Sequence, residues 1–248
     1  MKVKHEWHKD FFKNSFYNPA SPAAVAKAPM EVAFLLKQLR LKKGARLLDV
    51  CCGPARHSIL LAKRGFSVTG LDYSTDYLKE AAQKAKKAGV SLTLVRGDMR
   101  RLKFSGEFDA AINLFTSFGY FQRFSDDIKT LKGVARALKS GGLFIIDIVH
   151  GDFVSKNFRA SYWLKLEDGS YHLESSKLTK DGVFNTWTRI KNGKAVERSF
   201  FTRLYSKSRM SAALRRAGLE PLKFWGGFRG EKLTAKTNRL IVLAVKPK

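Results

Sequence analysis

Cysteine is scarce in this chain of 248 residues, and the scarcity excludes two kinds of structure. The two cysteines present, Cys51 and Cys52, are adjacent, and neighbouring cysteines very rarely form a strain-free disulfide. We therefore expect reduced thiols. No second cysteine pair and no histidine spacing typical of metal ligands accompanies them, so we also expect no bound metal.

Long apolar runs are absent as well. No stretch approaches the roughly 18 residues that a membrane-spanning helix needs. The opening residues, MKVKHEWHKDFF, lack the apolar middle of a signal peptide. These absences predict a cytoplasmic protein that has no membrane partner.

Acidic side chains are few compared with basic ones. Asp and Glu number 21 and Lys and Arg number 47, which gives a net charge of +26. Such a surplus attracts phosphate backbones, anionic membranes or acidic substrates. A solvated, Lys-rich surface explains it more simply than an RNA-binding face, because no arginine-glycine repeat and no basic low-complexity tail is present. RNA stays open as a partner.

What the chain does contain is a regular alternation of apolar and amphipathic stretches. Strands are expected at 45–50, 66–72, 92–98, 108–115 and 142–149, and helices at 31–41, 56–64, 75–88 and 126–139. Strands that alternate with helices form a parallel sheet with right-handed crossovers. The sequence therefore predicts a single α/β domain over residues 1–248. Its core, residues 31–150, is a doubly wound, mostly parallel, Rossmann-like sheet.

Two segments depart from this alternation. Residues 1–30 are rich in aromatic side chains and prolines, and we expect them to form an arm of helical fragments and turns. Residues 161–205 contain Asp168-Gly169, Asp181-Gly182 and Asn192-Gly193 between runs rich in β-formers. These turn dipeptides predict an antiparallel meander of about four strands, inserted after the fifth strand. In residues 206–248, a helix at 206–217 and strands at 219–225 and 239–246 then complete seven strands.

Chemically useful residues follow successive strands of the predicted sheet. In an open parallel sheet, ligands lie beyond the carboxyl ends of the strands, where the strand order reverses. The first strand ends in Asp49 and turns through small residues from Cys51 to Ala55, which let a ligand approach the backbone. Asp72 ends the second strand, where an acid can accept both hydroxyls of a ribose. Further along, Asp98-Met99 ends the third strand and can bind an adenine through the carboxylate and the thioether.

Four segments in this order resemble the class I S-adenosylmethionine-dependent methyltransferases. They are LLDVCCGPARH, VTGLDYS, RGDMRRL and FDAAINLFTSFGYF. The resemblance implies that the first faces the methionine part of the donor, the second the ribose, the third the adenine and the fourth the transferred methyl group. We expect the donor, S-adenosyl-L-methionine, to contact Tyr17, Asp49, Cys51, Gly53, Ala55, Asp72, Tyr73, Asp98, Met99, Asn113 and Leu114.

The loop departs from the family pattern at two positions. The family usually has glycine at the positions of Cys51, Gly53 and Ala55, and only Gly53 is kept. Cysteine and alanine are small, so we expect donor binding to survive. A nicotinamide dehydrogenase ranks lower, since the stretch from Cys51 to Arg56 does not match G-x-G-x-x-G.

Some donor-site residues have a second interpretation. Asp49 either contacts the donor or only fixes the turn through backbone amides. Asp98 either binds adenine or is an exposed turn acid. For Asp72, ribose binding is favoured over a helix cap because of its place in the series.

The sequence identifies the residues on the acceptor side less specifically than those on the donor side. Methyl transfer from a sulfonium is a direct displacement, so a dedicated base is optional. The candidates are His150, Tyr120 and Tyr205. His150 either titrates near neutrality or is a buried histidine bonded to backbone, and Tyr120 either stacks on substrate or fills the core.

The predicted acceptor pocket lies between the aromatic arm, the SFGYF segment and the meander. We expect methyl transfer to nitrogen or oxygen of a small metabolite, anionic ones included, by a monomer or homodimer. The alternatives are an RNA methyltransferase and a donor-binding protein without catalysis.

Overall fold

The computed structural model describes Trp7, Phe11, Phe12, Phe16 and residues 18–248. Tyr17, one of the expected donor contacts, lies outside the described residues. In the part of the chain that the structure describes, no helix is both long enough and apolar enough to cross a bilayer.

The central sheet has seven strands in the order β10-β11-β5-β4-β1-β2-β3. Their bounds are β1 Arg46–Val50, β2 Ser67–Asp72, β3 Thr93–Arg96, β4 Phe108–Asn113, β5 Leu138–Val149, β10 Glu220–Trp225 and β11 Arg239–Val245. Strands β1 to β5 pair in parallel, whereas β11 is antiparallel to both β5 and β10. The predicted mostly parallel, seven-stranded sheet is confirmed. The strand order reverses between β1 and β4, which is where such a sheet takes its ligand.

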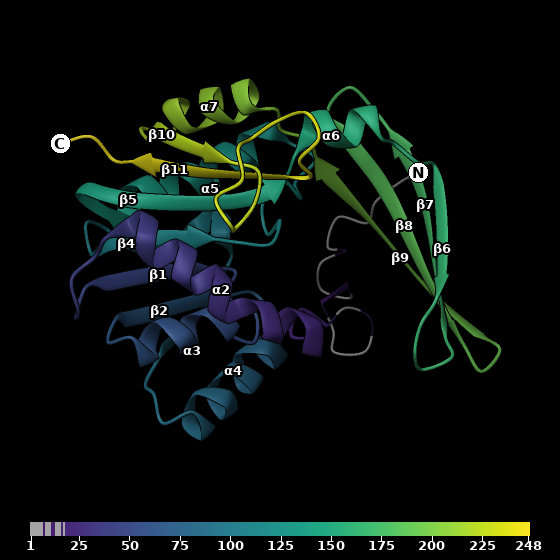
Figure 1. The fold of residues 1–248 in the computed structure, drawn as a ribbon, viewed down its shortest axis with the longest axis horizontal. Coiled ribbons are helices and arrows are strands. Elements are labelled where there is room, and N and C mark those ends of the chain that lie inside the picture. The colour runs from purple at the N-terminus through teal and green to yellow at the C-terminus, as the bar shows by residue number, and fades with distance from the viewer. Residues whose placement is uncertain (1–6, 8–10, 13–15, 17) are drawn as a thin grey trace.

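Helices cover both faces of this sheet (Figure 1). Their bounds are α2 Pro22–Leu39, α3 Arg56–Lys63, α4 Thr75–Lys87, α5 Phe124–Ala137 and α7 Lys207–Arg216. One apolar cluster joins α5 and α7 to the sheet through Leu131, Met210 and Leu214. A second cluster joins α2 and α3 to it through Leu35 and Leu61. The sheet is therefore buried on both sides, as parallel strands require.

A separate four-stranded antiparallel sheet follows β5. It consists of β6 Ser161–Lys165, β7 Tyr171–Leu178, β8 Gly182–Lys191 and β9 Lys194–Arg203 in sequential order. Asn192 and Gly193 have φ of 50° and 71° in the turn between β8 and β9, as a two-residue hairpin requires. Figure 1 shows this sheet beside the central one, at the end of β5 that leads into it. The predicted meander of four strands is confirmed.

The main differences from the sequence prediction concern the start of one helix, the start of one strand and one added helix. Helix α2 begins at Pro22 rather than at residue 31, because Ser21 caps it with its hydroxyl and Pro22 occupies a first-turn position, where a missing amide is harmless. Pro29 lies inside that helix instead of preceding it. Strand β5 starts at Leu138, earlier than expected, and a short helix α6, Gly151–Lys156, follows it. The sequence pattern predicted no helix there.

Candidate functional site

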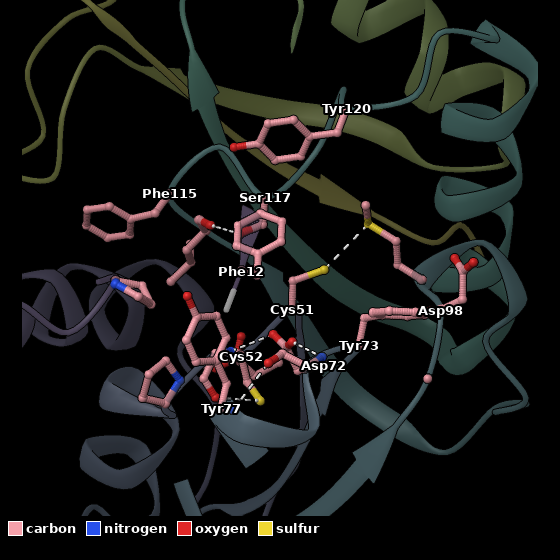
Figure 2. Close-up of a pocket in the computed structure, with 18 of the residues that line it drawn as sticks. Phe12, Cys51, Cys52, Asp72, Tyr73, Tyr77, Asp98, Phe115, Ser117 and Tyr120 are labelled. Carbon is pink, nitrogen blue, oxygen red and sulfur yellow. Dashed lines mark hydrogen bonds between the residues drawn. The ribbon is translucent and has the colours of Figure 1, made fainter. Parts of the chain in front are cut away.

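A pocket opens at the carboxyl ends of β1 to β4 (Figure 2). It encloses about 1180 Å³, part of which is open solvent. Nine predicted site residues line it, namely Asp49, Cys51, Gly53, Asp72, Tyr73, Asp98, Met99, Leu114 and Tyr120. Trp7 and Phe12 of the aromatic arm line it as well. The strand-end series and the arm therefore meet around one cavity.

The loop after β1 keeps the shape of a glycine loop with only one of its three usual glycines. Cys51, Gly53 and Ala55 have φ of 64°, 54° and 60°. These left-handed conformations suit glycine, and they cost other L-residues roughly 1–2 kcal/mol each. The three positions that the family usually fills with glycine are thus the three that need positive φ. The loop therefore differs from the family in two residue types but keeps the positive φ angles at all three positions.

Asp72 ties this loop to the next turn. Its Oδ2 accepts from the Gly53 amide at 2.8 Å and its Oδ1 from the Ser74 amide at 2.8 Å. Burial raises the pKa of Asp72, and the amides of Ser74 and Gly53 oppose that shift. Because each carboxylate oxygen has two lone pairs, both can still accept from a ligand hydroxyl. The cap of α4 is Ser74, which accepts from the Tyr77 amide, so Asp72 is not the helix cap.

Asp49 is almost fully buried behind the loop. Its Oδ2 accepts from the Ser58 hydroxyl in the first turn of α3, at 2.6 Å. Burial raises the pKa of Asp49, and the hydrogen bond from Ser58 opposes the shift. The side chain therefore joins β1 to α3 through a hydroxyl while still lining the pocket, whereas one of its two interpretations from the sequence was that it fixes the turn through backbone amides.

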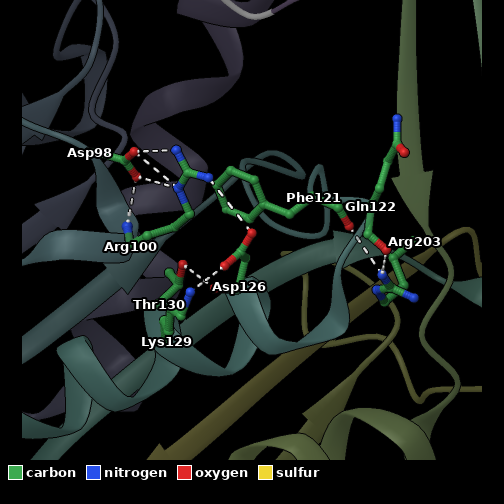
Figure 3. Close-up of polar contacts among 8 residues, drawn as sticks. All are labelled: Asp98, Arg100, Phe121, Gln122, Asp126, Lys129, Thr130 and Arg203. Atoms are coloured by element: carbon green, nitrogen blue, oxygen red, sulfur yellow. Dashed lines mark hydrogen bonds and ion pairs between the residues drawn. The ribbon is translucent and has the colours of Figure 1, made fainter. Parts of the chain in front are cut away.

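The far end of the donor side is formed by Asp98, Met99 and Arg100. Asp98 accepts from the Arg100 amide at 2.9 Å and from its guanidinium, with Nη2 at 2.6 Å (Figure 3). That guanidinium lies 4.6 Å from the centre of the Phe121 ring. The Sδ of Met99 is 3.5 Å from the Sγ of Cys51. Asp98 is thus an ion-paired acid at the rim of the pocket.

The thiols of the loop are not set up as nucleophiles. Burial raises the pKa of Cys51 and of Cys52 well above the ordinary thiol value, and neighbouring carboxylates add to the shift. Both cysteines are free, as the sequence predicted. Since only the thiolate is a strong nucleophile, these side chains serve packing.

Aromatic rings form the opposite wall of the pocket. The centre of the Trp7 ring lies 5.3 Å from that of Tyr120 and 5.6 Å from that of Phe200 in β9. The Phe12 ring contacts Tyr120 at 6.3 Å and Tyr77 at 6.4 Å. In Figure 2, Tyr120 lies across the pocket from Asp72 and Tyr77. Among the described residues of the arm, Trp7 therefore links Tyr120 of the pocket to Phe200 of the second sheet.

Several lining residues were not singled out from the sequence. They are Pro19, Arg56, His57, Tyr77, Arg100, Phe115, Ser117 and Phe121. Most of them lie within one of the four sequence segments that resemble the family. Their membership of those segments was the signal that could have identified them. His57 also has a partner outside these segments. Its buried Nε2 lies 2.8 Å from the carboxylate of Glu31 in α2. No local pattern pointed to that pair.

Four predicted residues are not part of the lining. Ala55 is buried in the loop, and the Asn113 amide donates to the Val50 carbonyl at 2.9 Å, joining β4 to β1. His150 is buried, with its Nδ1 3.0 Å from the Thr237 carbonyl. Tyr205 donates its hydroxyl to Asp127 at 2.7 Å. Burial, and next the charge of Asp127, raises the pKa of Tyr205 far above its ordinary value.

Comparison with known proteins agrees with this geometry. The sequence profile of a methyltransferase domain matches residues 47–142. The putative methyltransferase YqeM of Bacillus subtilis (strain 168) is 32% identical over 220 residues, which cover 84% of this chain and 87% of that protein.

Two solved structures share the fold. A S-adenosylmethionine-dependent methyltransferase from Clostridium acetobutylicum ATCC 824 has a TM-score of 0.80 at 21% identity, covering 89% of this chain and 92% of that chain. The SAM-bound CalS10, an amino pentose methyltransferase from Micromonospora echinaspora, has a TM-score of 0.62 at 20% identity, covering 94% and 99%.

The strand order and the strand-end pocket define a Rossmann-like enzyme with its ligand site at the switch point of the sheet. The chain belongs to the class I S-adenosylmethionine-dependent methyltransferases. Its methyl donor is S-adenosylmethionine, whose sulfonium supplies an electrophilic methyl group when it is bound. The residues present fit this donor, because Asp72 offers two acceptor oxygens and the loop lines the pocket from Cys51 to Pro54.

Proposed function

We propose that the methyl acceptor is a nitrogen or oxygen of a small metabolite, anionic ones included. The observation that carries this proposal is a single pocket with a donor loop on one side and aromatic rings on the other. Such a cavity suits a compact ligand, since its walls are mainly apolar with a few polar groups. Arg56 lines the same pocket and adds positive charge that would attract an anionic acceptor, whereas the charge of Arg100 is paired with Asp98.

The residues divide between holding the donor and holding the acceptor. On the donor side we assign Asp72 to the ribose and Asp98 with Met99 to the adenine. On the acceptor side we keep Tyr120, which lines the pocket. The acceptor would be aligned by stacking and by exclusion of water under the arm, which is most of what a direct displacement requires.

His150 and Tyr205 do not face this pocket, so we assign neither of them a proton-transfer role. The Tyr205 hydroxyl is committed to Asp127, and its raised pKa keeps it protonated, so the phenolate that could act as a base does not form. His150 caps α6 and lies 3.0 Å from the Thr237 carbonyl. In both cases the buried, structural interpretation is the better one.

A transfer assay tests this function. Purified protein is incubated with methyl-labelled S-adenosylmethionine and a panel of small amines, amino acids, hydroxy acids and amino sugars, and label in the acceptor is measured. We expect transfer to one chemical class, with the rate reduced by Tyr120→Ala. Transfer to none of the panel would contradict the proposal.

RNA is the second candidate because of the +26 charge. The same assay with total tRNA and rRNA distinguishes the two. Transfer to RNA, together with an affinity that falls steeply with salt, would replace the small-molecule proposal. Salt-dependent binding without transfer would reflect the charge alone.

A further inference from the structure

Much of the acceptor-side wall of the pocket comes from one irregular segment, residues 114–122, called here the wall segment. Leu114, Phe115, Ser117, Tyr120 and Phe121 all line the pocket from it. Its backbone is strained, since Phe115 and Thr116 have φ of 56° and 54°. Consecutive non-glycine residues in the left-handed region persist only where their surroundings hold them. The contacts that hold the segment therefore set the shape of the wall.

A buried carboxylate fixes the first end of the wall segment. Asp147 in β5 accepts from the Phe115 amide at 2.8 Å, and its carbonyl accepts from the Thr116 amide at 2.9 Å. The same carboxylate is paired with the guanidinium of Arg239 in β11, with Nε at 2.7 Å. Both partners belong to the central sheet, so this end is part of the core.

A second buried pair, Arg203 with Asp127, fixes the other end of the wall segment, and Arg203 belongs to the second sheet. Arg203, the last residue of β9, donates from Nη2 to the carbonyls of Phe121 and Gln122, at 3.1 and 2.7 Å. Its backbone amide donates to the Gly119 carbonyl at 2.7 Å. Figure 3 shows the side chain of Arg203 at these two carbonyls. One residue thus holds the wall segment at three carbonyls.

Arg203 is itself held by Asp127 in α5. The guanidinium Nε lies 2.8 Å from Asp127 Oδ2, which also accepts from Tyr205. Both side chains are nearly fully buried, at 3% and 0% exposed. Asp127 Oδ1 finds no hydrogen-bond partner among the described residues. Such buried pairs add little stability over an apolar replacement, which leaves positioning as the explanation for this one.

We propose that Arg203 is a positioning residue for methyl transfer, which holds Tyr120 and Phe121 in the acceptor wall and couples that wall to the second sheet. The proposal rests on the proposed function insofar as the acceptor lies beside Tyr120. Arg239 is its counterpart at the other end, and the two pairs act on different parts of one segment. The second sheet then contributes to the pocket without any of its residues lining it.

Two donor analogues test this without a known acceptor. S-adenosylhomocysteine lacks the methyl group, whereas in sinefungin an amine-bearing carbon replaces the sulfur, so that the amine takes the place of the methyl group and reaches toward the wall. In Arg203→Lys, a single ammonium nitrogen replaces Nε and Nη2, so the contact with Asp127 and the contacts with the two carbonyls cannot all keep their geometry. We expect sinefungin affinity to fall about tenfold and S-adenosylhomocysteine affinity less than about threefold, because a displaced wall affects only the group that faces it.

Hydrogen exchange supplies the second readout. In Arg203→Lys, the amides of residues 119–122 should exchange at least about tenfold faster while those of β1 and β4 stay unchanged, because the loss is local. Arg239→Lys should instead accelerate exchange at 115–116. As a control, Arg215→Lys alters an exposed pair with Glu220 and should change neither readout.

A double variant that removes both charges keeps the proposal testable if the single variant does not fold. If Arg203→Lys fails to fold, Asp127→Asn with Arg203→Gln removes both charges while keeping donors and acceptors, and the same two measurements apply. An unchanged ratio of the two affinities, or exchange that rises evenly through the chain, would overturn the proposal. Failure of the acceptor screen would leave it standing, since neither ligand is an acceptor.

Discussion

In the donor half of the pocket, Cys51, Gly53 and Asp72 come from two consecutive strand-to-helix turns. On the side that we assign to the acceptor, Trp7 and Tyr120 line the pocket from the N-terminal arm and from the turn after β4, and Trp7 packs in turn against Phe200 of the second sheet. The donor half is therefore fixed by neighbours in sequence, and the acceptor half by contacts between distant segments. Local turns can keep one cofactor in place while the distant segments change to suit another acceptor.

The largest expected effect is a loss of donor affinity on substitution of Asp72, in the donor half of the pocket. Asp72→Ala removes the acceptor of the Gly53 and Ser74 amides and of the expected ribose hydroxyls. We expect S-adenosylhomocysteine affinity to fall roughly 1000-fold, about 4 kcal/mol, from two charge-assisted hydrogen bonds. Titration calorimetry measures it. Asp76→Ala, at an exposed carboxylate in the first turn of the following helix α4, should leave the affinity unchanged.

The pH dependence of the free energy of unfolding tests the environment of Asp127, the partner of Arg203. Burial raises its pKa to about 6, with hydrogen bonds from Tyr205 and Arg203 opposing. Since the folded state then binds the proton more tightly than the unfolded one, the contribution to stability is present at low pH and is lost as the pH rises through 6. Relative to Asp127→Asn, the wild-type free energy of unfolding should drop by about 3 kcal/mol between about pH 4 and 7.

Urea unfolding at several pH values gives this difference. Subtracting the Asp127→Asn curve removes the titration of all other groups to first order. A difference that stays flat with pH would mean that Asp127 is ionised throughout and that its pairing with Arg203 outweighs its burial.

A smaller effect is expected at the junction of the two sheets. Gly119 has φ of 88°, and a Cβ there would lie 3.2 Å from the Arg203 carbonyl oxygen. Gly119→Ala should lower the free energy of unfolding by about 2 kcal/mol, from backbone strain and from the close contact. Gly141→Ala is matched in φ, at 75°, with nothing within 4 Å, and should lose only about half as much. Equal losses would show that the close approach is unimportant.

The smallest effect concerns the second sheet away from the pocket. Trp163 in β6 is 66% exposed. Trp163→Ser should change the free energy of unfolding by no more than about 0.5 kcal/mol, because an exposed ring loses little burial, and donor affinity should not change. A larger loss in thermal unfolding would indicate that this face of the sheet is covered in solution.

Prediction from sequence succeeded where the information is local. The strand ends at Asp49, Asp72 and Asp98 follow directly from apolar runs bounded by turns, and the hairpin at Asn192-Gly193 follows from its turn chemistry. The order of these features was enough to indicate the fold and the family. Even the missing glycines did not mislead, since small residues stand in their places.

The remainder depends on contacts that no spacing encodes. Arg203 and Asp127 are separated by 76 positions, and Glu31 and His57 by 26. Each member looks like an ordinary charged or polar residue of a strand or helix until the fold brings the two together. His150 and Tyr205 show the converse, because both follow strands at the correct edge of the sheet yet are committed to Thr237 and Asp127. Burial decides such cases, and burial is a property of the tertiary structure.

The donor loop has a consequence for how relatives of this chain are recognised. Cys51, Gly53 and Ala55 share one backbone conformation, but a search pattern written as three glycines would match only the middle position. A pattern written in torsion angles would match all three. Distant members of such families are therefore better defined by where the chain turns left-handed than by which residue letter is found there.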